Sequence, residues 1–287
     1  MNNEVVLTAM QISDIKDKAK EVRRLFGIDD EVPIAKEIFM LLEKRNIILC
    51  EYPFEASQGS HTDATLTRFE ANGESLVFIG LNTSLYYDQQ IFALAHELYH
   101  FITQTGKAYT DEELENPLIE KMADRFAAEL LLPATELERR VIKEFGKRSI
   151  DEARYLRTLR FIARLQSEWW MPYHAIVNRL HEEGYLNEYF DKYYEIDDRK
   201  ESSIYCRIFQ AINQESYLTL NKRTNRKGVS SVALETIILN YEEGRMSDDE
   251  FAELLCLFGK TPEEFGYDLN TSAEDLDELS DLFEGGD

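Results

Sequence analysis

The sequence predicts an α+β fold that is mostly helical and carries one small antiparallel sheet. Apolar residues recur at helical spacing through much of the chain. Only a few short runs have strand character, chiefly residues 46–52, 62–69 and 76–81. The chain has 287 residues, of which 44% are hydrophobic, as expected for globular domains with a real core.

The first 145 residues are predicted to form one domain. Residues 13–26 have helical spacing and stop at Gly27, and a second helix should run from about Pro33 to Lys44. Three short strands follow, and Asn72-Gly73 favours a tight hairpin between the last two. We therefore expect two or three antiparallel strands packed on helices.

Two further regions are predicted downstream, at residues 146–195 and 196–287. In the first, two helices separated by a break at Met171-Pro172 weakly suggest a helix-turn-helix. The second should be a mixed α+β region with an acidic tail. We expect two strands within residues 204–220 and a helical pair further on, at residues 232–240 and 248–258.

Charge is unevenly distributed along the chain. The formal net charge is 32 − 55 = −23, which argues against a protein whose whole surface binds nucleic acid. Residues 246–287 hold fourteen acidic residues and only Lys260 as a base. An opposite feature is an arginine stripe on one predicted helix, formed by Arg154, Arg157, Arg160 and Arg164. A solvated helix face is the ordinary interpretation of such a stripe; among functional roles, we favour a dock for the acidic tail over a nucleic-acid contact.

The remaining compositional signals indicate a cytoplasmic protein. Cys50, Cys206 and Cys256 are odd in number and far apart, which is typical of reduced thiols. The first residues lack the basic start and apolar run of a signal peptide, and no stretch approaches membrane-spanning length.

The strongest functional signal is the stretch IFALAHELYHFI at residues 91–102. Only His96, Glu97 and His100 interrupt its apolar character, and burying three ionisable groups is costly unless something satisfies them. On a helix, residues four apart share a face, so both imidazoles can reach one metal ion. The pattern H-E-x-x-H is that of zinc metalloproteases.

A catalytic zinc needs a third protein ligand, and the next predicted helix offers one. In PLIEKMADRFAAELLLP, Glu120 and Asp124 lie four residues apart on one face. We expect Glu120 to ligate the metal and Asp124 to accept the free N–H of a ligating histidine. Glu97 should act as the general base and acid of peptide hydrolysis.

These motifs, HELYH followed by EKMADRFAAELLLP, resemble the signature of the ImmA/IrrE family of metallopeptidases. The family pattern has asparagine or aspartate at the position of Asp124. The resemblance covers residues 13–137 well, and it implies a zincin-like fold and one zinc ion per chain. It also implies a cytoplasmic endopeptidase that cleaves a helix-turn-helix repressor or antitoxin-like partner, in a stress or mobile-element response.

Two parts of such a site remain open in the sequence. The strand at residues 76–81 runs almost directly into the predicted helix at residues 91–102, which we call the metal helix. We expect an edge of this strand to hold substrate peptide by β-augmentation, through Leu76, Phe78, Gly80 and Asn82. The oxyanion of the transition state needs a further donor, for which the candidates are His61, Tyr99, Tyr86 and Tyr87.

A second interpretation belongs to another class of protein. The helix-turn-helix-like segment and the long C-terminal region also suit a non-catalytic, zinc-binding regulatory protein. Structural zinc sites usually have four protein ligands, and the sequence offers no clear fourth.

Overall fold

The computed structural model describes the chain in six stretches, residues 5–54, 62–71, 74–106, 116–151, 154–186 and 189–269. It divides into two compact units, Met1–Arg226 and Lys227–Asp287. The boundaries predicted from sequence, near residues 145 and 195, stay a prediction, since they concern subdivisions within the first unit.

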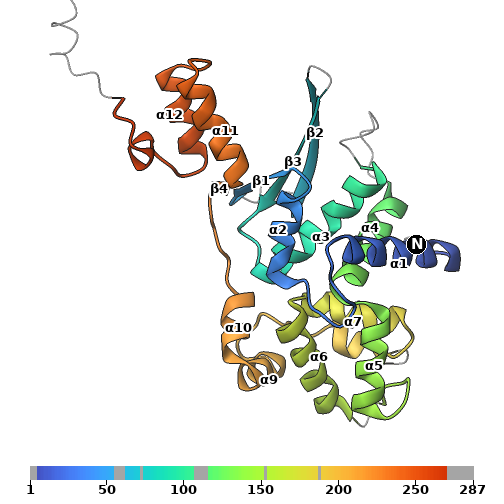
Figure 1. Ribbon diagram of the computed structural model, residues 1–287. Coiled ribbons are helices and arrows are strands. Elements are labelled where there is room, and N and C mark those ends of the chain that lie inside the picture. The colour runs from blue at the N-terminus through green and yellow to red at the C-terminus, as the bar shows by residue number, and fades with distance from the viewer. Residues whose placement is uncertain are drawn as a thin grey trace, which may run out of the picture. The chain divides into compact units, whose positions relative to one another are not determined.

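The first unit is mostly helical with a small sheet, as predicted (Figure 1). Its strands are β1 (Ile47–Tyr52), β2 (Ala64–Ala71) and β3 (Glu74–Asn82). Its helices are α1 (Ala9–Leu25), α2 (Ile38–Glu43), α3 (Tyr87–Thr103), α4 (Pro117–Leu131), α5 (Ala134–Phe145), α6 (Tyr155–Trp169), α7 (Tyr173–Glu182), α8 (Phe190–Tyr194), α9 (Ile204–Ile212) and α10 (Gln214–Leu220), with a short 3-10 turn at Ala35–Glu37.

The sheet is mixed, where the sequence led us to expect an antiparallel one. β2 and β3 pair antiparallel, with Leu66 opposite Ile79 in the register. β1 instead pairs parallel with β3, with Leu49 beside Ile79. The hairpin prediction is therefore right about β2 and β3, and the antiparallel prediction is wrong for β1.

The prediction that residues 76–81 offer a free edge is wrong. β3 lies between β2 and β1, so both of its edges are already paired. β2 is the outer strand of this group, since no other described strand pairs with its far side. An incoming peptide could therefore add to β2, whereas Leu76, Phe78, Gly80 and Asn82 belong to an interior strand.

Helices α3 and α4 form the centre of the first unit. Along α3, Ile91, Leu94 and Ala95 are fully buried, as its nearly all-apolar sequence predicts. α4 packs against α3 and presents small residues, among them Ala123 and Ala127, both fully buried. Small side chains allow two helix axes to approach closely, which brings the polar residues of both helices within reach of each other.

Residues 204–220 form two helices, where the sequence led us to expect two strands. Ser203 and Asn213 cap α9 and α10, because their side chains accept hydrogen bonds from the backbone amides of Cys206 and Ser216. The β-branched and aromatic composition suggested strands. However, Tyr205 and Phe209 are buried four residues apart, which is the helical spacing.

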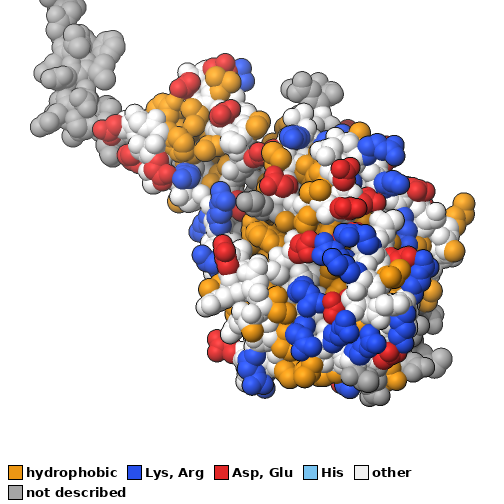
Figure 2. Space-filling view, turned by 60° about the horizontal axis from the view of Figure 1, so that its bottom comes forward, with side chains coloured by type: hydrophobic (Ala, Val, Ile, Leu, Met, Phe, Trp, Pro, Cys, Tyr) orange, Lys and Arg blue, Asp and Glu red, His pale blue; other side chains and the backbone are white. Residues whose placement is uncertain are grey.

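The arginine stripe lies on α6, and much of it is paired within the fold. Arg157 and Arg164 both bind Glu144 of α5, at 2.8 and 2.6 Å, and Arg154 donates to the Phe145 carbonyl. Figure 2 shows Lys and Arg side chains interleaved with Asp and Glu on this side of the molecule. These pairs favour the solvated-face interpretation; the proposed dock for residues 270–287 involves a tail outside the described residues.

The second unit contains the predicted helical pair, α11 (Ser231–Glu242) and α12 (Asp248–Leu257), with a two-residue strand β4 (Gly228–Val229) and a 3-10 turn at Pro262–Phe265. Tyr241 stacks on Phe251 with ring centroids 4.1 Å apart, and Tyr267 meets both rings edge-on. Ser247 and Glu250 form a capping box at the start of α12.

Two chain-wide expectations can be compared with the structure. All three cysteines are free, although only Cys206 is buried and Cys256 is exposed. Within the described stretches, no helix is both long enough and apolar enough to cross a membrane.

A buried ion-pair network joins α4 to α7. Arg179 of α7 is completely buried and binds Glu129 of α4 as well as Glu183, the latter at 3.1 Å. Arg125 of α4 binds both Glu182 and Glu183 at the end of α7. These bonds fix the position of α4, the helix that carries the predicted third metal ligand.

Replacing Arg179 with alanine should lower the free energy of unfolding by about 3–5 kcal/mol, because it leaves Glu129 buried without its cationic partner. Denaturant unfolding monitored by circular dichroism measures the change. Arg160→Ala is the control, since Arg160 is exposed and should change stability by less than about 0.5 kcal/mol. Equal unfolding midpoints for the two variants would contradict the role given to this network.

Candidate metal centre

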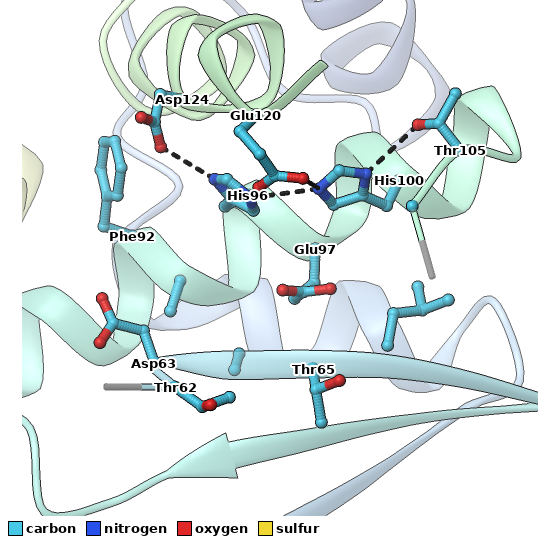
Figure 3. Close-up of a pocket in the computed structure, with 14 residues that line it drawn as sticks. Thr62, Asp63, Thr65, Phe92, His96, Glu97, His100, Thr105, Glu120 and Asp124 are labelled. Atoms are coloured by element: carbon cyan, nitrogen blue, oxygen red, sulfur yellow. Dashed lines mark hydrogen bonds and ion pairs between the residues drawn. The ribbon is translucent and has the colours of Figure 1, made fainter. Parts of the chain in front are cut away.

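Helix α3 places His96, Glu97 and His100 where its sequence predicts. Its first turn is held by Gln89, whose Oε1 accepts a hydrogen bond from the Tyr86 backbone amide at 3.2 Å. The helix ends at Thr103, and Gln104 follows in the left-handed conformation. The two histidines are four residues apart, so both imidazoles project toward α4 from the same face (Figure 3).

Glu120 of α4 completes a three-residue cluster with the two histidines. Its carboxylate oxygens lie 3.1 Å from His96 Nε2 and 3.7 Å from His100 Nε2. The two Nε2 atoms are themselves 3.1 Å apart. The three ligand atoms all lie within 4.8 Å of one another, which makes this a group able to hold a metal ion.

The outer ring nitrogens of both histidines face oxygen atoms. His96 Nδ1 lies 2.9 Å from Asp124 Oδ1, and His100 Nδ1 lies 3.2 Å from Thr105 Oγ1 (Figure 3). An Nδ1–H donated to these oxygens leaves each Nε2 as a lone-pair donor aimed at the shared centre. Asp124 therefore has the supporting position that the sequence suggested for it.

This donor set fits a zinc ion. Two nitrogens bound tetrahedrally to zinc at about 2.0–2.1 Å lie roughly 3.3 Å apart, close to the observed separation of the two Nε2 atoms. Two imidazoles and one carboxylate, with no fourth ligand among the residues that the structure describes, match the ligand count of catalytic zinc sites.

The electrostatics of the cluster also favour a cation. Burial acts to lower the pKa of His96, but hydrogen bonds with Asp124 and Glu120 outweigh it and raise the pKa to about 10. Hydrogen bonds with His100 and His96 lower the pKa of Glu120. The surrounding carboxylates thus stabilise positive charge at this point, whether it is a proton or a metal ion.

Glu97 lies on the open side of the cluster. Its side chain sits between the histidines and β2 (Figure 3), and the residue is only 8% exposed. Burial raises the pKa of its carboxyl, and a hydrogen bond with the backbone of Leu66 on β2 partly opposes that rise. A carboxylate with a raised pKa is a better proton acceptor near neutral pH.

The cluster opens into a cleft of about 480 Å³. One wall is α3, from Phe92 to His100, and the opposite wall is the start of β2, at residues 62–66. Glu120 and Asp124 of α4 form the third side. The cleft therefore lies between the metal helix and the outer strand of the sheet.

The other residues predicted for the site do not line this cleft. Leu76, Phe78, Gly80 and Asn82 lie on the interior strand β3. Asn82 is instead structural, since its side chain accepts from Phe54 N and Ser84 N and donates to the Thr62 carbonyl.

The three tyrosines considered as oxyanion donors also do not line the cleft. Tyr99 is 3% exposed and packs against Phe126 in the core. Tyr86 lies beneath two arginine side chains, and Tyr87 stacks on Phe39. His61 lies outside the described residues. Sequence reasoning thus did not find a donor for the oxyanion among the described residues.

Two residues of the site were missed in the sequence. Thr105 supports His100 as described above, and Gly106 follows it with φ +85°. A Cβ at Gly106 would lie 3.0 Å from His100 Nδ1, so both the backbone angle and the available space require glycine. The Thr-x-Thr-Gly run at residues 103–106, directly after the metal helix, was the available signal.

The N-terminus of α3 is anchored by residues far downstream. Asp88 is fully buried, and both of its carboxylate oxygens lie 2.8 Å from Arg199 Nη2. Gln166 of α6 also donates to Asp88 at 2.8 Å, and Tyr205 in turn donates to Gln166 at 2.6 Å. Burial raises the pKa of the Asp88 carboxyl, and Arg199 opposes that rise.

Residues 221–226 add a strap along the same end of α3. The Tyr87 amide donates to the Lys222 carbonyl, and the Asn225 amide donates to the Thr83 carbonyl. Thr83 Oγ1 donates to the Arg226 carbonyl at 2.7 Å. The position of the metal helix therefore depends on chain segments more than a hundred residues away.

In a comparison with known protein families, residues 42–181 match the family model of the IrrE N-terminal-like domain, a peptidase family. These residues belong to the ImmA/IrrE family of metallopeptidases. The match spans the sheet, the metal helix and α4, and it ends within α7. A comparison with curated proteins gives no match. The Asp88 partner Arg199 and the strap lie beyond the family match.

Removal of either a histidine or the glutamate of the cluster should abolish metal binding. We expect His100→Ala and Glu120→Ala to retain less than about a tenth of the zinc bound by the original protein, because two ligands rarely hold the ion. Elemental analysis after dialysis against zinc measures this. Glu97→Gln should keep the full stoichiometry. Full zinc content in Glu120→Ala would rule out Glu120 as a ligand.

Arg199→Ala should destabilise the protein by about 3–5 kcal/mol, because it leaves Asp88 buried and uncompensated. It should also weaken zinc binding, since the first turn of the metal helix loses its anchor. Denaturant unfolding and competition with a chelating dye measure the two effects. Arg207→Ala on the exposed face of α9 is the control. Zinc affinity and stability equal to those of the control would disprove the anchor.

Proposed function

We propose that this protein is a zinc-dependent endopeptidase in which Glu97 moves the proton during peptide-bond hydrolysis. The observation that carries the proposal is the position of Glu97, buried beside the His96–His100–Glu120 cluster and open to a cleft. Membership of residues 42–181 in a peptidase family supports it.

Each residue of the cluster has a distinct part in this mechanism. His96, His100 and Glu120 would hold the ion, with Asp124 and Thr105 keeping the two rings in position. Bound zinc supplies Lewis acidity toward water and the scissile carbonyl. The Glu97 carboxylate takes a proton from the attacking water at one of its oxygens and passes it to the leaving amine.

Strand β2 is the surface that would hold the substrate backbone. It is the outer strand of its group, its first residues line the cleft, and Leu66 reaches Glu97 through its backbone. An extended peptide can add to such an edge through main-chain hydrogen bonds. This arrangement would place the scissile bond between β2 and the metal helix.

A helix-turn-helix repressor or antitoxin-like protein is the substrate that we propose, with cleavage acting in a stress or mobile-element response. Support comes from the family resemblance, in which such repressors are the targets. A cleft walled by a strand edge suits an extended segment, which favours a linker or locally unfolded stretch of the partner.

The alternative of a non-catalytic zinc regulator finds less support. Within the described stretches, the cluster holds three ligand residues, and a closed structural zinc site would need a fourth. The cleft beside Glu97 is also an unexpected feature in a site that only stabilises a fold.

Glu97→Gln should bind zinc normally but cleave its partner at least about a hundredfold more slowly, because an amide cannot accept the proton. This variant, used as bait in cell extract, should retain the substrate. The captured proteins are then incubated with the zinc-loaded original protein, and new N-termini are identified by mass spectrometry.

The same experiment separates the competing interpretations. Equal cleavage by Glu97→Gln and the original protein would exclude the proposed mechanism. Captured partners that remain intact with zinc-loaded protein would support the regulatory alternative. A cleaved partner with no DNA-binding domain would support the peptidase proposal and contradict the proposal that the substrate is a repressor.

A further inference from the structure

A second, smaller cavity lies beside the metal cleft on the side of the N-terminal half of α3. It has a volume of about 240 Å³, equivalent to roughly eight water molecules at about 30 Å³ each. Asp63, Phe92 and Asp124 line both cavities, so the two are continuous. In Figure 3 these three residues lie together at one end of the cleft. We call this cavity the side pocket.

The direction of β2 indicates which part of a substrate would reach the side pocket. The chain runs from Asp63 into β2 and past Leu66, and α3 runs in the same direction, from Phe92 to His100 (Figure 3). A peptide that pairs antiparallel with β2 therefore runs the opposite way. Its residues after the scissile bond pass Asp63 and Phe92, at the mouth of the side pocket.

Of the charged residues that line the side pocket, Asp63 is exposed, and the other four already form ion pairs within the fold. Arg125 is 4% exposed and binds Glu182 and Glu183, and Lys121 Nζ lies 3.6 Å from Glu182. Asp124 binds His96. A charged substrate side chain would have to lose its hydration in the pocket and compete with these existing pairs for a counter-ion, which is costly.

The polar group left for a ligand is an amide. Asn178 of α7 lines the side pocket and is half-buried, and its side chain makes no hydrogen bond with any described residue. Gln89, the other amide, uses its oxygen to cap α3 and keeps its NH₂ group. The remaining wall is apolar and includes Phe92, Pro172 and Ala175. A ligand that both donates and accepts hydrogen bonds, and carries no charge, matches this lining.

We propose that the side pocket binds the carboxamide side chain of a glutamine or asparagine located C-terminal to the scissile bond, with Asn178 as the residue that selects it. This inference rests on the proposed peptidase function. The Asn178 amide forms two hydrogen bonds with the substrate amide. In each bond the N–H of one amide donates to the carbonyl oxygen of the other. The methylene groups of the substrate side chain pack against Phe92 and Ala175.

The test uses the full-length, zinc-loaded protein and a library of peptides derived from a digested proteome. Mass spectrometry of the products gives the residues on both sides of each cleaved bond. One cleaved sequence is then synthesised in versions with glutamine, glutamate, lysine or norleucine at the side-pocket position. We expect kcat/KM to be about tenfold higher for glutamine than for any of the other three.

Two variants test the assignment to Asn178. In Asn178→Leu the preference for glutamine over norleucine should disappear, while the preference at positions before the scissile bond stays unchanged. In Asn178→Asp, which has nearly the same shape, the preference should shift to lysine. Asn240→Leu, on α11 of the second unit, is the matched control. Zinc content and thermal melting establish that each variant is folded and loaded.

The outcomes separate the two levels of the argument. No cleavage of any peptide or captured partner would overturn the proposed function and this inference with it. Cleavage with no preference for an amide at that position would overturn the inference alone. Cleavage with an amide preference that Asn178→Leu and Asn178→Asp leave unchanged would overturn the role of Asn178. A preference located before the scissile bond would overturn the antiparallel placement on β2.

Discussion

The rest of the structure depends on the cost of burying ionisable side chains, because helix α3 carries two histidines and a glutamate into an apolar core. Buried ionisable groups need partners, and here α4 supplies them with Glu120 and Asp124. Small residues on α4 allow this close approach, and the Arg125 and Arg179 ion pairs hold α4 in place from behind. The metal cluster and the helix packing are thus two aspects of one arrangement.

The separation in sequence between interacting residues explains which features could be predicted from the sequence. The residues of the metal cluster could be predicted from local spacing. His96 and His100 are four residues apart and share one face of their helix, and Glu120 and Asp124 share one face of theirs in the same way. The strand that borders the cleft could not be found in this way. β3 becomes interior only because β1, separated from it by more than twenty residues, pairs with it in parallel. No local pattern at residues 76–81 reports that pairing.

The other misjudged features have similar physical causes. Residues 204–220 have the β-branched and aromatic composition of strands, but burial of Tyr205 and Phe209 on one face decides for helices. The role of Asp88 could not be predicted from its local sequence, because its partner Arg199 is 111 residues away. The requirement for glycine at position 106 depends on the His100 ring, which only the folded turn brings near.

The strap at residues 221–226 is also the segment with which the first unit ends. The chain leaves the first unit at Arg226, the residue whose carbonyl is hydrogen-bonded to Thr83 just before the metal helix. The strap joins Arg199 and Gln166 among the downstream residues that contact the start of α3. Fraying of the last residues of the first unit would therefore be felt first at the hydrogen bonds that hold the start of α3. The geometry of the candidate metal centre thus depends on the segment with which the first unit ends.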